Sequence, residues 1–416
     1  MTLELMPEAL STFANTTAQQ FITPPNYKKS TTGQVCSRCI YDESTPSIVF
    51  DAQGVCNYCN LHDVMDAQYP TGAKGHEILM AQVAQMKERG KNNAFDCVIG
   101  VSGGCDSSYL VWQLKQWGLR PLAAHFDNTW NSPIATQNIY KVLNKLDVEL
   151  FTIVADSREY NDICRAFMLS GVKDIEAPTD IALAATCYKA AEKYNIPYII
   201  NGHSFRTEGV SPHGWIYFDG QYVKSVHKQY GTMPLKTYPN LDLFNFIKWT
   251  AFSGIAQLRP LYHLDYDKEA TKKFLAQEFG WEWYGGHHLE NRFTAFYHSY
   301  FIPRRTSYDM RMLGFAACTR SGQMTRDEAL AEMAKPPQCE ADVIQLVKTR
   351  LGFSDEEFER VLDLPLVPYT EFKTYKPFFE KARPFFWLMY KLDRVPKSFY
   401  LKYCFPGSQG VNKPAG

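Results

Sequence analysis

The stretch Asp96–Ser107 reads DCVIGVSGGCDS, and it decides the fold. Its apolar part, Asp96–Val101, predicts a short buried strand, and Ser107–Trp117 (SSYLVWQLKQW) predicts a helix that begins almost at once. The turn between them, Ser102–Asp106, carries two adjacent glycines. Glycine lets the backbone approach a ligand closely, and successive N–H groups in such a turn form an anion-binding nest. The stretch therefore predicts a strand, an anion-binding loop and a helix in direct succession.

Strand and helix patterns alternate on both sides of this loop. Parallel strands need helical crossovers and lie buried, so short apolar strands separated by helices indicate parallel βαβ units. We predict an α/β fold with a doubly wound parallel sheet, followed by a C-terminal third that is helical by pattern. The further elements expected are strands at 121–126, 148–154 and 196–201 and helices at 76–90, 132–146, about 158–170 and 178–194.

The chain divides into five expected parts. An N-terminal arm covers residues 1–35, and a four-cysteine module covers 36–75. The α/β domain follows at 76–258 and carries the glycine-rich loop. A helical region at 259–345 holds substrate and active-site residues, and a helical extension ends the chain at 346–416.

Composition excludes several classes of protein. The 416 residues include 44 Lys and Arg against 44 Asp and Glu, so a zero net charge gives no field to attract bulk nucleic acid. No apolar run approaches the roughly 18–20 residues of a membrane span, and the first twenty residues lack a secretory pattern. We expect a soluble cytoplasmic protein that binds no nucleic acid.

The loop residues suit phosphate and a divalent cation. Ser102 and Ser107 can donate hydroxyl hydrogen bonds, and the helix that follows adds its N-terminal N–H groups and its dipole. Phosphate alone would repel Asp106, so we expect a divalent cation beside that carboxylate. The alternative is a plain glycine-rich turn with Asp106 as a helix cap. No G-x-x-x-x-G-K-[ST] occurs, so the loop is not of the kind that handles a γ-phosphate.

Four of the eleven cysteines form two C-x2-C pairs, Cys36 with Cys39 and Cys56 with Cys59, separated by 16 residues. Such pairs converge readily on one tetrahedral ion, and four thiolates leave no open coordination position. We therefore predict a structural zinc. An iron–sulfur cluster or two coincidental turns are the alternatives.

Two polar strings lie in the helical region. Thr325 with Glu328 predicts a capping box that opens a helix. Gly285-Gly286 predicts a tight turn that presents His287 and His288. With Glu290 they could bind a metal, but H-H-x-E lacks the helical i, i+4 spacing, so we favour hydrogen bonds to a substrate.

The S-G-G-x-D-S loop resembles the ATP-pyrophosphatase (PP-loop) family, whose members hold the pyrophosphate of ATP and adenylate a carbonyl oxygen. The resemblance extends to His125, Phe126 and Asp127, where the backbone of family members contacts adenine, and to Gly202 after the fourth strand. The tRNA-modifying branch continues there with G-H-x-x-D-D-x-x-E. This chain lacks the Asp pair and keeps only Glu208 as a nearby carboxylate.

Together with the cysteine pairs, the strings at 284–290 (YGGHHLE) and 321–330 (SGQMTRDEAL) resemble the N-acetyl sugar amidotransferases. Those enzymes act in bacterial surface-polysaccharide pathways, on O-antigen nucleotide sugars or on nonulosonic acids such as pseudaminic acid. The resemblance runs from about residue 36 to about 370. His287 stands where Lys is expected, and Arg304–Ser307 replaces a Lys-Phe-type stretch. Both departures bear on which sugar is accepted.

The resemblance implies a reaction and its residues. An acetamido group would become an acetamidino group through an adenylated imidate and ammonia, with release of AMP and pyrophosphate. The implied cofactors are ATP, Mg²⁺ and structural Zn²⁺. The implied nucleotide site is Ser102, Gly103, Gly104, Asp106 and Ser107 with His125, Phe126, Asp127 and Gly202. The catalytic candidates are Asp106, Glu208, His288, Glu290 and Asp309. The substrate candidates are His287, Arg292, Arg311 and Arg326.

Two partners are expected. Thr2 replaces the N-terminal Cys of one glutaminase class and no G-x-C-x-G elbow occurs, so ammonia would come from a separate glutaminase, with a synthase-like channel subunit as a further partner. The segment Arg383–Cys404 interleaves aromatics with cations, and Pro396 should divide it into two short helices. It predicts either a docking surface for a membrane or partner, or a terminal helix packed on its own domain.

Two other functions remain open at this point. A zinc-containing PP-loop enzyme that thiolates tRNA would need a cysteine pair after the third strand, where only Cys164 occurs. A non-catalytic nucleotide-binding scaffold would bind ATP and form no AMP.

Overall fold

The computed structural model describes residues 20–25, 27, 33–212, 216–286, 289–306, 308–392 and 394–406. At its centre lies one five-stranded sheet with the order β4-β3-β2-β5-β6, in which every neighbouring pair is parallel. The chain order of the strands reverses between β2 and β5, which defines a doubly wound sheet. The strands are β2 (Cys97–Gly100), β3 (Pro121–Asp127), β4 (Leu150–Val154), β5 (Tyr198–Ile200) and β6 (Ala256–Leu258).

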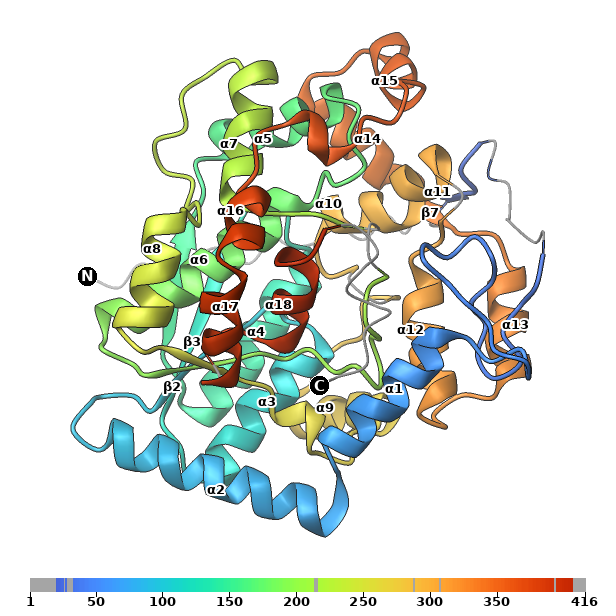
Figure 1. Ribbon diagram of the computed structural model, residues 1–416. Coiled ribbons are helices and arrows are strands. Elements are labelled where there is room, and N and C mark those ends of the chain that lie inside the picture. The colour runs from blue at the N-terminus through green and yellow to red at the C-terminus, as the bar shows by residue number, and fades with distance from the viewer. Residues whose placement is uncertain are drawn as a thin grey trace, which may run out of the picture.

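Helices cover both faces of this sheet, as Figure 1 shows. Successive residues of β2 point to opposite faces. Ile99 packs in an apolar cluster with the helices on one face, whereas Val98 packs against α6 on the other. The first face carries α2 (Gly72–Gly90), α3 (Cys105–Gln116), α4 (Pro133–Leu146) and α9 (Lys268–Phe279). The second carries α6 (Ala177–Lys193).

The C-terminal helices share the largest apolar core with α5 (Ser157–Leu169), α6 and α7 (Gly220–Tyr230). That core includes Phe167, Tyr222, Phe296 and Phe386. The elements that follow α9 are α10 (Arg292–Phe296), the π-helix η3 (Tyr297–Phe301), α11 (Ile302–Arg305), α12 (Arg311–Arg320), α13 (Arg326–Ala334), β7 (Cys339–Glu340), α14 (Ala341–Leu351), α15 (Asp355–Leu362), the 3-10 helix η4 (Tyr369–Glu371), α16 (Lys376–Lys381), α17 (Arg383–Lys391) and α18 (Lys397–Tyr403).

The connections complete the molecule. The described part of the N-terminal arm pairs antiparallel with β7 through β1 (Phe21–Ile22). The cysteine module, which ends in α1 (Asn57–Gln68), packs beside α12 and α13 (Figure 1). Between α7 and β6 lie α8 (Leu243–Ile247) and the π-helix η1 (Lys248–Phe252), and the 3-10 helix η2 (Pro260–Tyr262) follows β6. No described helix has both the length and the apolar character that a membrane crossing requires.

Several local predictions are confirmed. The Ser132 hydroxyl accepts from the Ala135 N–H at 3.1 Å and caps α4. Thr325 and Glu328 form the capping box of α13. Pro396 separates α17 from α18. The fifth strand, β6, was not predicted, because its three residues carry no pattern that separates them from a loop.

Candidate functional site

The glycine-rich loop is built as a rigid turn. Gly103 has a φ of +80°, and a Cβ there would lie 2.2 Å from the Ala135 carbonyl oxygen, so only glycine fits. The Gly103 carbonyl accepts from the Trp281 indole at 3.0 Å. The backbone before α3 is therefore fixed by neighbours from two distant parts of the chain.

The N-terminus of α3 has no side-chain cap. The Ser102 hydroxyl accepts from the Gly104 N–H at 3.3 Å, and the Ser107 hydroxyl donates to the Gly104 carbonyl. The Tyr284 hydroxyl interacts with the Cys105 N–H. An uncapped helix start behind two glycines suits an anion, because the unpaired N–H groups and the dipole both favour negative charge.

This loop lies at the switch point of the sheet. Ser102 follows β2, and Gly202 follows the neighbouring β5. A Cβ on Gly202 would lie 3.9 Å from the Ser107 backbone nitrogen, so the two carboxyl-end segments adjoin. In open α/β sheets ligands bind in the crevice where the strand order reverses.

Two carboxylates and a lysine meet at the start of α3. The Lys268 ammonium lies 3.0 Å from Asp106 Oδ2, and Tyr266 donates its hydroxyl to the other oxygen. Glu208 interacts with Asp106, and its charge also acts on Lys268. The Glu208 Oε2 lies 3.8 Å from His203 Nε2. Glu208, the one carboxylate that this chain keeps from the G-H-x-x-D-D-x-x-E pattern, therefore contacts Asp106 of the glycine-rich loop.

Electrostatic interactions favour the charged forms of Asp106 and Lys268. Burial acts to raise the pKa of Asp106, but the Lys268 charge and the hydrogen bonds from Tyr266, Glu208 and Lys268 outweigh it, so the pKa is lowered. Burial acts to lower the pKa of Lys268, but the two carboxylates outweigh it and raise the pKa. Mg²⁺ is usually held by one or two carboxylates together with substrate phosphates. Asp106 and Glu208 beside an anion-binding turn fit that donor set.

The predicted adenine-contact residues line the end of β3. His125 is buried, and its ring bridges the Val101 carbonyl (2.8 Å) and the Asn131 amide (3.0 Å). Phe126 packs into the apolar core, and the Asp127 carboxylate accepts from the Thr129 N–H. Of the three, only His125 contacts the segment that leads into the loop, and the backbone of all three pairs with β4 on one side. Their contact with adenine stays a prediction.

Glu290 joins the C-terminal region to the loop. Its Oε1 accepts from the Ser102 hydroxyl at 3.2 Å, and its carbonyl accepts from the Ser132 N–H. The next residue, Asn291, caps α10 by accepting from Phe293 N–H at 3.1 Å. The start of α10 is thereby fixed against the glycine-rich loop. His287 and His288 lie outside the described residues.

Three other candidates form ion pairs within the protein. Asp309 pairs with Arg311 at 2.6 Å, and Arg311 also donates to the Lys335 carbonyl. Arg292 pairs with Glu340 and with Asp342. The structure therefore gives these guanidinium groups protein partners, and their roles toward a substrate stay predictions.

The four module cysteines are buried, and their sulfur atoms lie within 4.8 Å of one another. The sulfur–sulfur distances of Cys36–Cys59, Cys39–Cys56 and Cys56–Cys59 are 3.8, 3.7 and 3.6 Å. A tetrahedral zinc with Zn–S bonds of about 2.3 Å has sulfur atoms about 3.8 Å apart. Backbone N–H groups of Arg38, Cys39 and Cys56 all point at Cys36 Sγ. The donors fit a closed, structural zinc site.

Two arginines complete the module. Arg320 donates to Cys39 Sγ at 3.2 Å and to Cys59 Sγ at 3.4 Å, which offsets thiolate charge. Arg326 donates to the Cys36 and Cys39 carbonyls, so its guanidinium supports the module instead of facing the loop. Sequence reasoning missed Arg320, although it directly precedes the S-G-Q-M-T-R string.

Sequence reasoning also missed the residues that hold the loop: Tyr266, Lys268, Trp281 and Tyr284. Little in the sequence indicated that Lys268 holds the loop. Asp267 caps α9 by accepting from the Ala270 N–H, so the sequence is equally typical of a surface helix that begins at Lys268. Only the fold brings it to Asp106.

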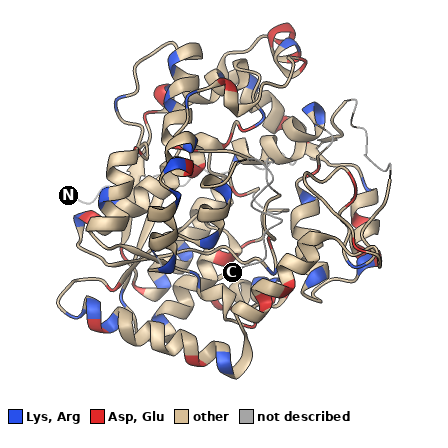
Figure 2. Ribbon diagram, in the orientation of Figure 1, with Lys and Arg blue, Asp and Glu red and all other residues tan. Residues whose placement is uncertain are grey.

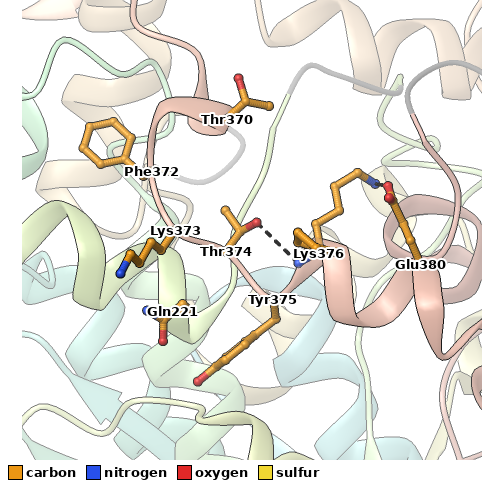
Figure 3. A pocket seen from close by; sticks show the side chains of 9 residues that line it. Gln221, Thr370, Phe372, Lys373, Thr374, Tyr375, Lys376 and Glu380 are labelled. Carbon is orange, nitrogen blue, oxygen red and sulfur yellow. Dashed lines mark hydrogen bonds and ion pairs between the residues drawn. The ribbon is translucent and has the colours of Figure 1, made fainter.

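A separate cavity of about 490 Å³ opens among the C-terminal helices (Figure 3). Lys373, Thr374 and Lys376 lie on its wall with Gln221 of α7. The Lys376 ammonium is already occupied, since it donates to the Lys402 and Phe405 carbonyls. The cavity contains no residue of the glycine-rich loop.

Comparison with known proteins gives one family match. Residues 290–384 match the family described as "LPS biosynthesis protein WbpG-like, C-terminal domain". No curated protein matches the chain at a significant level. The matched segment begins at Glu290, the residue that contacts Ser102 of the loop.

Two solved structures are similar to the chain at low scores. The NMN synthetase from Francisella tularensis is 13% identical, covers 71% of this chain and 97% of its own, and has a TM-score of 0.31. The NH3-dependent NAD synthetase from Campylobacter jejuni subsp. jejuni NCTC 11168, in complex with the nitrate ion, is 14% identical over 70% of this chain and 98% of its own, also at 0.31. The fold assignment rests on the strand order of the sheet itself.

Proposed function

We propose that this chain is an ATP-dependent amidotransferase that converts an acetamido group of a bacterial surface-polysaccharide sugar into an acetamidino group. The observation that carries the proposal is the meeting of Asp106, Glu208 and Lys268 at the uncapped, glycine-rich start of α3. The match of residues 290–384 to an LPS biosynthesis domain supports the sugar as acceptor. The nucleotide and the acceptor would meet where Glu290 contacts the loop.

The chemistry explains why ATP is needed. An amide carbonyl is a poor electrophile, and ammonia does not displace its oxygen directly. In the first step the amide oxygen bonds to the α-phosphorus of ATP while the bond to pyrophosphate breaks. In the second step ammonia bonds to the amide carbon and loses a proton, and the carbon–oxygen bond breaks to release AMP. The products are the amidine, AMP and pyrophosphate.

The chain's own residues orient the reactants and balance charge. The hydroxyls of Ser102 and Ser107 and the first N–H groups of α3 would hold the pyrophosphate of ATP. Asp106 and Glu208 would hold Mg²⁺, which neutralises charge on the leaving phosphates. Glu208, with His203 beside it, is also placed to orient ammonia or take its proton.

The source of ammonia is part of the proposal. Burial raises the pKa of Cys105 and of Cys187 to about 12, and it raises that of Cys164 well above its ordinary value. Such thiols are poor nucleophiles for glutamine hydrolysis. We therefore propose a separate glutaminase subunit that supplies ammonia, with a synthase-like subunit that guides it. A cytoplasmic location stays a prediction.

The tRNA-thiolation alternative receives less support. Cys164 is 1% exposed within the apolar core, where a sulfur-carrying cysteine could not reach tRNA. In the view of Figure 2, Lys and Arg positions alternate with Asp and Glu positions along the ribbon.

The test is a screen for AMP release. Purified chain would be incubated with ATP, Mg²⁺, ammonium salts at high pH and a panel of free and nucleotide-linked acetamido sugars. We expect AMP and pyrophosphate with one sugar class and no response to glutamine. Release of ADP and orthophosphate as the stoichiometric products would contradict the proposal, and so would the absence of AMP with every sugar.

A further inference from the structure

Exposed apolar side chains gather in two short segments of the chain. Of the sixteen exposed large apolar side chains in the described residues, seven lie within residues 244–252 and 378–392. They are Phe244, Phe252, Phe378, Phe385, Trp387, Leu388 and Leu392. Single exposed apolar residues are ordinary on a protein surface, whereas a group of them marks a place where something binds. The two segments therefore indicate an interaction surface.

Helix α17 has a buried side and an exposed side. Phe386 and Met389 are buried in the largest apolar core. Residues three or four positions apart lie on the same side of a helix, and the exposed residues of α17 and its end follow that spacing. They are Phe385, Trp387, Leu388, Lys391 and Leu392, which we call the outer face of α17.

A second exposed row runs from α8 into η1. Phe244 and Phe252 are 77% and 83% exposed, the highest values among the large apolar side chains of the described residues. Lys248 lies between them, four residues from each, and pairs with Glu192 at 2.5 Å. About one helical turn separates each member from the next, so the three side chains lie on one side of the helix. We call Phe244, Lys248 and Phe252 the α8 row.

The α8 row adjoins the outer face of α17. The guanidinium of Arg394, three residues beyond α17, donates to the carbonyl of Gly254, two residues beyond η1. The ring of Phe246 in α8 lies 5.3 Å from that of Phe399 in α18, between the ring centres. Figure 1 shows α8 beside α17. The two exposed segments are therefore neighbours on the surface.

This part of the chain is basic, although the protein as a whole is neutral. Residues 376–406 include seven Lys and Arg against two Asp and Glu, in a chain that has 44 of each kind. Among the described residues of this stretch, only Lys376 pairs with a carboxylate, that of Glu380. Lys381 and Lys391 are exposed and have no such partner in the described chain. Their charges are left for an anionic surface outside the protein.

We propose that the outer face of α17 and the α8 row dock this protein on an anionic phospholipid surface. The apolar side chains enter the boundary between headgroups and acyl chains, and the cations lie at the lipid phosphates. Trp387 suits that boundary, where tryptophan is enriched, and the Lys391 ammonium lies 5.7 Å from its ring centre. A protein partner fits less well, because lysine is depleted from protein interfaces. The inference goes beyond the proposed function and does not depend on it.

The test is cosedimentation of the full chain with phosphatidylcholine vesicles that contain or lack phosphatidylglycerol. We expect wild type to sediment with the phosphatidylglycerol vesicles, and less so as salt rises, because salt screens the attraction. Trp387→Gln with Leu388→Gln should lower the vesicle affinity roughly tenfold or more. The matched control, Tyr140→Gln with Val154→Gln, changes two comparably exposed apolar side chains elsewhere and should sediment as wild type does.

A second pair of variants tests the charge. Lys381→Gln with Lys391→Gln should weaken binding to the phosphatidylglycerol vesicles roughly tenfold at low salt, and by less at high salt. The matched control, Lys74→Gln with Lys189→Gln, removes two exposed lysines of α2 and α6. The circular dichroism spectrum and the zinc content should match wild type in every variant, so that a loss of binding reports on the surface and not on the fold.

Wild-type protein that stays in the supernatant with the phosphatidylglycerol vesicles would overturn the proposal. Apolar and lysine variants that sediment as wild type does would also overturn it. Sedimentation velocity checks for another occupant: a wild-type dimer that becomes a monomer in the Trp387, Leu388 variant would assign the face to a second copy and not to lipid. No readout here uses turnover, so failure of the docking leaves the proposed reaction standing.

Discussion

The cysteine module and the carboxylate of Asp174 are both buried and polar, but the fold satisfies their polar groups to different degrees. In the module, Arg320 donates to two sulfur atoms and Arg326 to two carbonyls, so each guanidinium has protein partners. Asp174, in contrast, is 1% exposed and accepts from the Tyr217 N–H, but its Oδ1 has no hydrogen-bond partner among the described residues. Polar groups that the protein satisfies itself indicate a structural site, whereas a buried oxygen without a partner lowers stability.

The start of α3 combines polar side chains that have protein partners with a helix end that has no side-chain cap. Asp106 is held by Tyr266 and Lys268, yet the helix that it opens has no side-chain cap. Its lysine and carboxylates are arranged in advance, and the further N–H groups of its first turn can bind an anion. A site of this kind orders its charges before the substrate arrives, which is what electrostatic catalysis requires.

The largest expected effect concerns this start of α3. Asp106→Asn should lower kcat by about 10²- to 10³-fold, because the cation and the leaving phosphates lose a charged ligand. Zinc content and melting temperature should remain close to wild type. The matched control is Asp265→Asn, an exposed carboxylate on the same segment as Tyr266. Wild-type turnover in the Asp106 variant would show that the loop does not carry the chemistry.

The next effect concerns the module. Cys39→Ser should abolish stoichiometric zinc and unfold the module, since structural zinc contributes roughly 10 kcal/mol or more to folding. Arg320→Met should keep zinc but lower stability by about 1–3 kcal/mol, because the thiolates lose a charged donor. Metal analysis and thermal unfolding would measure both, with Cys318→Ala as the control. A fully stable, metal-free Cys39 variant would contradict the structural role.

A smaller effect should follow pH. Burial raises the pKa of Asp174 to about 7, although Lys173, the Tyr217 N–H and Lys402 act against the rise. The unfolded carboxyl ionises near pH 3.9, at about its ordinary pKa. The folded chain therefore binds the extra proton between these values, and this group lowers stability as pH rises from about 4 to about 7.

Asp174→Asn removes this penalty. The ligand-free variant should unfold at a higher temperature than wild type at pH 8, and the difference should vanish near pH 4. Differential scanning calorimetry at the two values would measure it. A variant less stable than wild type at pH 8 would mean that Asp174 serves the fold, and the contrast with the cysteine module would then fail.

The smallest effect concerns the outer face of α17. Phe386 and Met389 are buried, whereas Trp387 and Leu388 are each 47% exposed, so the predicted docking segment contributes to the core on one side only. Trp387→Glu with Leu388→Glu should change stability by less than about 0.5 kcal/mol. If that face meets a membrane, cosedimentation with anionic vesicles should be lost in the variant. Equal sedimentation of both proteins would remove the docking role.

Much of the fold followed from local sequence patterns. The glycine-rich loop, two helix caps and the positions of the strands up to β5 are encoded in short stretches of sequence, so local patterns could predict them. Glu208 was predicted as a catalytic candidate, and the structure places it beside Asp106. The strand β6 was not predicted, because its three residues are too few to show the alternation of apolar and polar residues that is typical of a strand.

The rest depends on contacts between distant parts of the chain. Lys268 meets Asp106 across 162 residues, and Arg326 meets Cys36 across 290. An arginine in a polar string looks the same whether its guanidinium faces a substrate or a carbonyl. Asp174 gave no signal in the sequence, because a buried oxygen without a partner is a property of the folded chain.

The most direct measurement of the central claim follows the oxygen of the acetamido group. A sugar that responds in the AMP screen would be prepared with oxygen-18 in its acetamido carbonyl and converted with ATP and ammonium. If the carbonyl oxygen attacks the α-phosphorus, mass spectrometry must find the label in AMP and none in pyrophosphate. Unlabelled AMP, with the heavy oxygen retained in the sugar or released to water, would contradict the account.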